Sequence, residues 1–188
     1  MATPPVFVSG AILTAAQMNS IGLWKISTTV MSGVTTSVSG CFSSDFANYR
    51  VVCQNLTGAA ASTRLLSLRF RTTSDDTTAS YNFGTFGTTS PGTTTQLATN
   101  GATSATLSAL GAQPSGSAAG GFVLDIMSPN VASGTTYTGS GIMYQPDLVS
   151  YVSRSFSGNM TTATQYTGFT IFGVTDALSG TLQVYGYN

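Results

Sequence analysis

The sequence contains no histidine and no glutamate, and Lys25 is its single lysine. Without histidine, the usual base for a serine or cysteine nucleophile and the commonest transition-metal ligand are both missing. A hydrolase with paired carboxylates would have to rely on aspartate, and Asp75 and Asp76 form the only adjacent pair. Adjacent residues of a strand point to opposite faces, so we interpret this pair as a solvated turn. We therefore expect no enzyme activity, no cofactor and no metal site.

Charge is scarce as well, because six basic and six acidic side chains give a formal net charge of zero over 188 residues. A neutral chain has little electrostatic attraction for nucleic acid or for an acidic membrane surface. No apolar run approaches the roughly eighteen residues that a membrane-spanning helix needs. The first residues also lack the basic start of a secretory signal. The expected partners therefore include neither nucleic acid nor membrane.

Hydroxyl side chains replace the missing charges, since about three residues in ten are serine or threonine. Together with valine, tyrosine, phenylalanine and 21 glycines, they favour strands and turns over helices. The clearest pattern lies between residues 49 and 71, where two strands are joined by a loop of small residues. Leu66, Leu68 and Phe70 alternate there with polar residues, as in a strand with one buried face. Cys41 and Cys53 lie in similar surroundings, which favours buried thiols over a disulfide.

The chain divides into two parts. Residues 1–22 are predicted to form an extended N-terminal arm that ends in one short helix, for which Thr14 and Gln17 provide a capping box. Such a short helix must dock, either on its own domain or on a neighbouring molecule. Residues 23–188 show regularly spaced strands and turns. This spacing predicts an all-β domain, an antiparallel, jelly-roll-like β-sandwich of about eight strands.

Within this domain, one long strand is expected over residues 24–42. Residues 81–86 are a further strand candidate, although we interpret the glycine-containing residues 84–87 as turns. Residues 88–119 are a Thr, Ser and Gly-rich excursion with two weak strand signals, at 94–97 and 105–110. We expect this excursion to lie on the outside of the domain or to cross to a neighbouring subunit.

Two groups of side chains are candidates for a partner surface. Arg69 and Arg71 share the polar face of a strand and could hold an acidic partner, although a solvated face that discourages edge pairing is favoured. Tyrosines gather in the second half of the sequence, where they fill the core first. Surplus tyrosines would form a subunit interface or a glycan-stacking surface. We therefore select Arg69, Arg71, Tyr185 and Tyr187 as a hypothetical subunit interface or partner face.

Several segments resemble small structural proteins of tailed bacteriophages, of the minor-tail or capsid-decoration type. The resemblance lies in the opening Val6-Phe7-Val8-Ser9-Gly10-Ala11-Ile12-Leu13-Thr14-Ala15-Ala16-Gln17-Met18-Asn19 followed by Trp24, in Asp45-Phe46-Ala47-Asn48-Tyr49-Arg50-Val51-Val52, in Leu68-Arg69-Phe70-Arg71, and in the closing Gly180-Thr181-Leu182-Gln183-Val184-Tyr185-Gly186-Tyr187. It covers the first seventy residues and the last ten, whereas residues 75–165 carry none of it.

The resemblance implies a β-sandwich of a virion, commonly trimeric, that is attached to other virion proteins through its N-terminal segment. The residues expected to anchor the chain are Pro5, Phe7, Leu13, Met18, Ile21 and Trp24. A short, single-domain chain without a fibre shaft favours a capsid decoration or cement protein, bound to itself and to the major capsid or tail protein. The alternative is a tail-fibre or receptor-binding tip that recognises a host surface glycan through tyrosines and the excursion.

Overall fold

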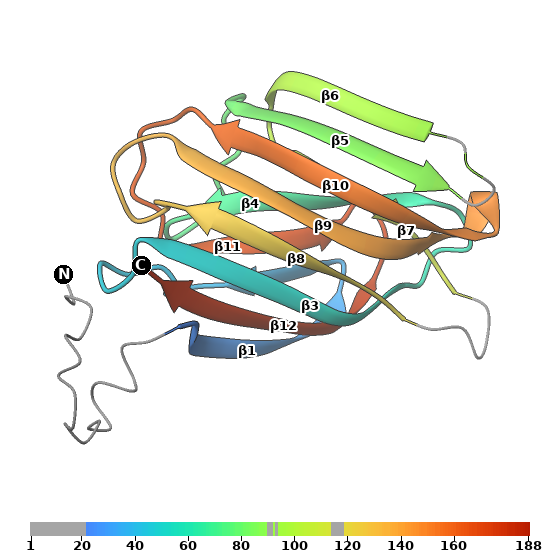
Figure 1. The fold of residues 1–188 in the computed structure, drawn as a ribbon, viewed down its shortest axis with the longest axis horizontal. Coiled ribbons are helices and arrows are strands. Elements are labelled where there is room, and N and C mark those ends of the chain that lie inside the picture. The colour runs from blue at the N-terminus through green and yellow to red at the C-terminus, as the bar shows by residue number, and fades with distance from the viewer. Residues whose placement is uncertain (1–21, 90–91, 93, 114–118) are drawn as a thin grey trace, which may run out of the picture.

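The computed structural model describes residues 22–89, 92, 94–113 and 119–188 of the chain. Two β-sheets face each other in these residues, and every pairing between neighbouring strands is antiparallel (Figure 1). The predicted all-β sandwich is confirmed. The large sheet has eight strands in the order β1-β12-β3-β8-β9-β10-β5-β6, and the small sheet has four in the order β2-β11-β4-β7.

The strand bounds are as follows. The large sheet is formed by β1 (Trp24–Gly33), β12 (Leu178–Tyr187), β3 (Asn48–Gly58), β8 (Gly120–Met127), β9 (Thr135–Gln145), β10 (Ser150–Met160), β5 (Tyr81–Thr89) and β6 (Thr94–Ala102). The small sheet is formed by β2 (Thr35–Val38), β11 (Gly168–Gly173), β4 (Arg64–Arg71) and β7 (Ala105–Leu110). A single 3-10 turn, Pro146–Leu148, connects β9 to β10.

The described residues form more strands than the expected eight or so, because some predicted segments are divided and weak ones are extended. The strand expected over residues 24–42 ends at Gly33, whose φ of 90° turns the chain, and β2 then joins the other sheet. The weak signals at 94–97 and 105–110 correspond to β6 and β7. Residues 84–87, interpreted as turns, lie inside β5, so that interpretation is wrong.

The two strands between residues 49 and 71 lie on opposite sides of the core. β3 pairs with β12 and β8 in the large sheet, whereas β4 pairs with β11 and β7 in the small one. The predicted burial is confirmed, since Leu66, Leu68 and Phe70 of β4 are fully buried, as are Tyr49 and Val51 of β3. Alternation thus brings the apolar faces of two different sheets together.

Residues 88–119 do not all lie on the outside of the domain. β6 is the exposed edge strand of the large sheet, in agreement with that prediction. β7, in contrast, contributes Ala105, Leu107 and Leu110 to the core, and all three side chains are almost completely buried. The sequence does not reveal that β7 is buried, because threonine and serine alternate with alanine and leucine in this strand. The neighbouring residues have the same composition.

Both cysteines are buried and free, as predicted. Burial raises the pKa of each thiol to about 12, because a thiolate would lose its solvation in the core. Cys53 directs its sulfur toward the Met31 thioether at 3.7 Å. These thiols therefore belong to the packed interior.

The predicted helix and most of the arm lie outside the described residues. Five of the six proposed anchor residues belong to that segment: Pro5, Phe7, Leu13, Met18 and Ile21. In the part of the chain that the structure describes, no helix is long and apolar enough to cross a membrane.

Candidate functional site

The small sheet covers one face of the large sheet, and the opposite face of the large sheet points outward (Figure 1). Side chains alternate between these faces along every strand. The register aligns the outward residues into rows that cross the sheet, and one such row passes from Arg50 to Asp125, Thr138, Ser157 and Gly84. We call the outward side chains of β12, β3 and β8 the tyrosine half, and those of β9, β10, β5 and β6 the hydroxyl half.

The tyrosine half is built around an ion pair. Arg50 donates from Nε to Oδ1 of Asp125 and from Nη2 to Oδ2, each at 2.8 Å. These hydrogen bonds raise the pKa of the Arg50 guanidinium, against a smaller lowering by burial. Tyr187 lies at the same carboxylate, with its hydroxyl 3.5 Å from Oδ1. Burial is the larger cause that raises the pKa of Tyr187, and the negative charge of Asp125 raises it further.

One of the predicted anchor residues lies close in the sheet to two of the predicted interface residues. Trp24 begins β1, and its partner in β12 is Gly186, which stands between Tyr185 and Tyr187. Lys25, the next residue of β1, pairs with Tyr185 itself. Trp24 remains 41% exposed. The first described strand therefore enters the sheet directly beside the C-terminal tyrosines.

The hydroxyl half contains a shallow trough of about 590 Å³. Its lining includes the outward residues Phe86, Gln96, Thr138, Ser155 and Ser157, arranged around Gly84. None of the described residues that line it is charged. The ring of Phe86 is 53% exposed, and open space lies where a side chain of Gly84 would be. The trough therefore presents an aromatic surface, hydroxyls and one amide to the solvent.

The hydroxyl half owes its neutrality to the direction of one side chain. Arg154 is the only charged residue in β9, β10, β5 and β6. It alternates with the exposed residues Ser153 and Ser155, so it faces the other side of the sheet. Burial lowers the pKa of Arg154. No charge from these four strands consequently reaches the outer face.

The structure does not bring Arg69 and Arg71 to the tyrosines, because both arginines lie on β4 of the small sheet. The guanidinium of Arg69 stacks over the Phe172 ring at 4.6 Å and donates from Nε to the Thr103 carbonyl at 3.1 Å. Arg71 has a side chain only 16% exposed and forms an ion pair with Asp75, with Nε 3.7 Å from Oδ1. The four residues selected as one partner face thus belong to two different sheets.

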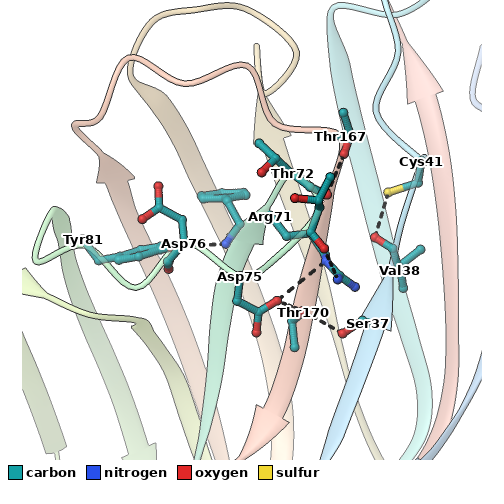
Figure 2. Close-up of polar contacts among 12 residues, drawn as sticks. Ser37, Val38, Cys41, Arg71, Thr72, Asp75, Asp76, Tyr81, Thr167 and Thr170 are labelled. Atoms are coloured by element: carbon teal, nitrogen blue, oxygen red, sulfur yellow. Dashed lines mark hydrogen bonds and ion pairs between the residues drawn. The ribbon is translucent and has the colours of Figure 1, made fainter.

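The pair of aspartates forms a bonded turn and not a solvated one, and Figure 2 shows the contacts of the Asp75 carboxylate. Asp75 accepts a hydrogen bond from the Thr170 hydroxyl at 2.6 Å. Asp76 accepts one from the Tyr166 hydroxyl at 2.7 Å and two from Thr78. Burial alone would raise the pKa of Asp76, but the hydrogen bonds from Thr78 and Tyr166 outweigh it and lower the pKa. The aspartates therefore attach the loop after β4 to the small sheet.

Neighbouring contacts extend this attachment into the core. The Tyr81 hydroxyl accepts from the backbone N–H of Phe70 at 2.8 Å and donates to the Asp76 carbonyl at 3.1 Å. The hydroxyl of Thr170 also lies 3.0 Å from the hydroxyl of Ser37.

Among the described residues, no group of three or more His, Cys, Asp or Glu side chains lies close enough together to hold a metal ion.

The trough residues Phe86, Ser155 and Ser157 were not predicted as a site, and Gln96 was included only as part of the excursion over residues 88–119. Their signal was weak, since hydroxyls and glycines occur throughout the chain and carry no information about which of them meet. The number of exposed hydroxyls on one face became apparent only through the register of four strands.

No family model, no curated protein and no solved structure matches this chain.

Proposed function

We propose that this chain is a non-enzymatic structural protein of a bacteriophage virion, a trimeric capsid decoration or cement protein attached through its N-terminal segment. The observation that carries the proposal is the pairing of Trp24 with Gly186, which brings the start of β1 to the end of β12 that holds Tyr185 and Tyr187. Segments from the two ends of the chain, both of which carry the phage resemblance, share one corner of the large sheet. An arm that attaches to a lattice would leave the domain at this corner.

The tyrosine half has the composition of a contact surface. Tyrosine and arginine are enriched in protein interfaces, and here they lie beside exposed apolar residues of the same face. Val30 of β1 is 73% exposed and Val123 of β8 is 37% exposed. The charges of Arg50 and Asp125 already satisfy each other, so a partner could cover them at lower cost than unpaired charges.

The composition supports assembly as well. A chain with a net charge of zero has little self-repulsion to keep it apart from other copies. Symmetric association about a threefold axis would bury the apolar side chains of the tyrosine half. The absence of histidine and glutamate from the sequence supports a non-enzymatic role.

Removing residues 1–22 tests the attachment. We expect the truncated protein to keep its β-rich circular dichroism spectrum and to lose binding to phage particles that lack the protein, as measured by co-sedimentation. The full-length chain with Val149→Ala is a matched control, because Val149 is 77% exposed in the turn between β9 and β10, away from Trp24. Undiminished binding of the truncated protein would contradict attachment through this segment.

A second candidate position is the tail tip, where the protein would recognise a host glycan. The neutral trough of the hydroxyl half favours this alternative, because sugars are bound by stacking and hydrogen bonding and need no charge. The copy number per particle separates the two positions. Hundreds of copies indicate a capsid decoration protein, whereas a handful indicate a tail protein.

A further inference from the structure

We infer that the trough of the hydroxyl half is a binding site for a neutral saccharide, with Phe86 as its stacking platform. The inference rests on the glycan-binding alternative and is independent of attachment through Trp24. The site consists of residues of β5, β6, β9 and β10. It includes neither Tyr185 and Tyr187 nor any of the expected anchor residues.

The shape of the trough follows from the register. Gly84 and Ala98 lie opposite each other on β5 and β6 and form a low floor. Phe86 and Gln96, one row further along the same strands, form a raised side. From Thr138 to Ala98 the row crosses three strand spacings, or about 14 Å. A volume of about 590 Å³ lies within the range of small-ligand pockets.

The chemistry of the lining matches both surfaces of a sugar. A saccharide presents apolar C–H groups on its ring faces and hydroxyls around its edge. The half-exposed ring of Phe86 offers a flat apolar surface for a ring face. Thr138, Ser155 and Ser157 each provide a hydroxyl that can donate and accept, and Gln96 adds an amide with both functions.

The electrostatics select a neutral ligand. A charged ligand needs an opposite charge when it leaves water, and the described residues that line the trough include no charged side chain. Asp125 is the partner of Thr138 in the next strand, and its charge is already paired with Arg50. An anionic or cationic sugar would therefore lose solvation without gaining a partner.

The glycine in the floor fits a close-approaching ligand. No atom lies within 4 Å of the position that a Cβ of Gly84 would occupy, so packing does not require glycine there. Glycine inside a strand weakens the strand and often marks a site where a ligand comes close to the backbone. Gly139 and Gly158 of neighbouring strands differ, because a Cβ at either would collide with core atoms.

The composition of the trough favours a saccharide over a protein partner. Serine is depleted in protein interfaces, whereas aromatic residues, methionine and arginine are enriched. The trough has two exposed serines, one exposed threonine and a single aromatic ring among its outward side chains. The tyrosine half, with two tyrosines and Arg50 on its surface, is the better protein contact.

Calorimetric titration of the full-length protein tests the inference. The probes are a panel of neutral hexasaccharides, composed of glucose, mannose, galactose or xylose units, and one acidic oligogalacturonate. We expect at least one neutral hexasaccharide to bind and the oligogalacturonate not to bind. Phe86→Ala should weaken the affinity about tenfold, because it removes the stacking surface. Gly84→Val should abolish binding by filling the floor without lowering the thermal midpoint.

Val149→Ala is the matched control, because Val149 is 77% exposed in the turn between β9 and β10 and does not line the trough. It should bind the hexasaccharide with unchanged affinity. The inference is overturned if no neutral hexasaccharide binds at millimolar concentration, or if Phe86→Ala and Gly84→Val bind as the unaltered protein does. Co-sedimentation of Phe86→Ala with particles keeps the two proposals apart, since this variant should attach normally.

Discussion

The two halves of the outer face share one continuous backbone ladder but present different surfaces. In one row of the sheet, Arg50 and Asp125 of the tyrosine half are followed by Thr138, Ser157 and Gly84 of the hydroxyl half. The row carries charge only at Arg50 and Asp125, and it ends at a glycine without a side chain. The hydrogen-bonded backbone is continuous across both halves. The outward side chains alone make the surface raised and ionic in the tyrosine half, and hollow and neutral in the hydroxyl half.

This contrast would allow one sheet to separate the two proposed roles without any change of fold. The tyrosine half adjoins β1, where the chain enters the domain, whereas the hydroxyl half ends at the free edge of β6. A lattice contact and a saccharide site could therefore operate at the same time. Variants in one half should leave the role of the other half intact, and this independence can be measured.

The largest expected effect is a difference in stability between two variants, each with one glycine replaced by alanine. Gly139 faces the core at the boundary between the halves, where a Cβ would collide with the Val123 carbonyl and the Phe156 ring, whereas Gly84 faces open space. Gly139→Ala should lower the free energy of unfolding by about 1–3 kcal/mol through overpacking. Gly84→Ala should change it by less than about 0.5 kcal/mol. Urea denaturation of the two variants measures both values, and equal values would contradict the assignment of the two faces.

A smaller effect is expected from a change of pH. Low pH should reduce the stability of the fold but should not change the affinity of the trough. The folded pKa of Asp76 is lowered, so the unfolded chain binds a proton at Asp76 more readily. The stabilisation from Asp76 is therefore complete above the unfolded pKa of about 4 and is lost as pH falls through the folded value. Asp76→Asn should reduce the difference between the urea midpoints at pH 7 and pH 3.

Saccharide binding provides the comparison for this experiment. The trough lining that the structure describes has no titratable side chain, so the affinity for the saccharide should be constant wherever the protein remains folded. An affinity that changed between pH 5 and pH 8 would show that a charged group takes part. An unaltered acid sensitivity in Asp76→Asn would mean that Asp76 does not determine the acid response.

The class of fold could be predicted from the sequence because alternation is a local property. Leu66, Leu68 and Phe70 mark a buried strand face by themselves, and they lie in the core as expected. The partner of each strand could not be predicted, since pairing depends on residues far apart in the chain. β3 and β4 are neighbours in sequence and lie in different sheets, whereas β1 pairs with β12 at the other end of the chain.

The candidate site was predictable only in part, for the same reason. Trp24, Tyr185 and Tyr187 attract attention as aromatic residues, but their proximity arises from the register between β1 and β12. Phe86 stands between glycines that resemble turn residues, although they lie inside β5. Ser155 and Ser157 are two among many hydroxyl residues. Their shared surface exists only after β9, β10, β5 and β6 have paired.

The most direct test of the central claim, a division of the outer face into a contact half and a neutral trough, is the mass in solution by light scattering. The unaltered protein should have three times the chain mass of 19.3 kDa. The double variant Tyr185→Ala, Tyr187→Ala should fall to the mass of a single chain, while Phe86→Ala should keep the mass of three. A single-chain mass for the unaltered protein, or loss of association in Phe86→Ala but not in the tyrosine variant, would contradict the account.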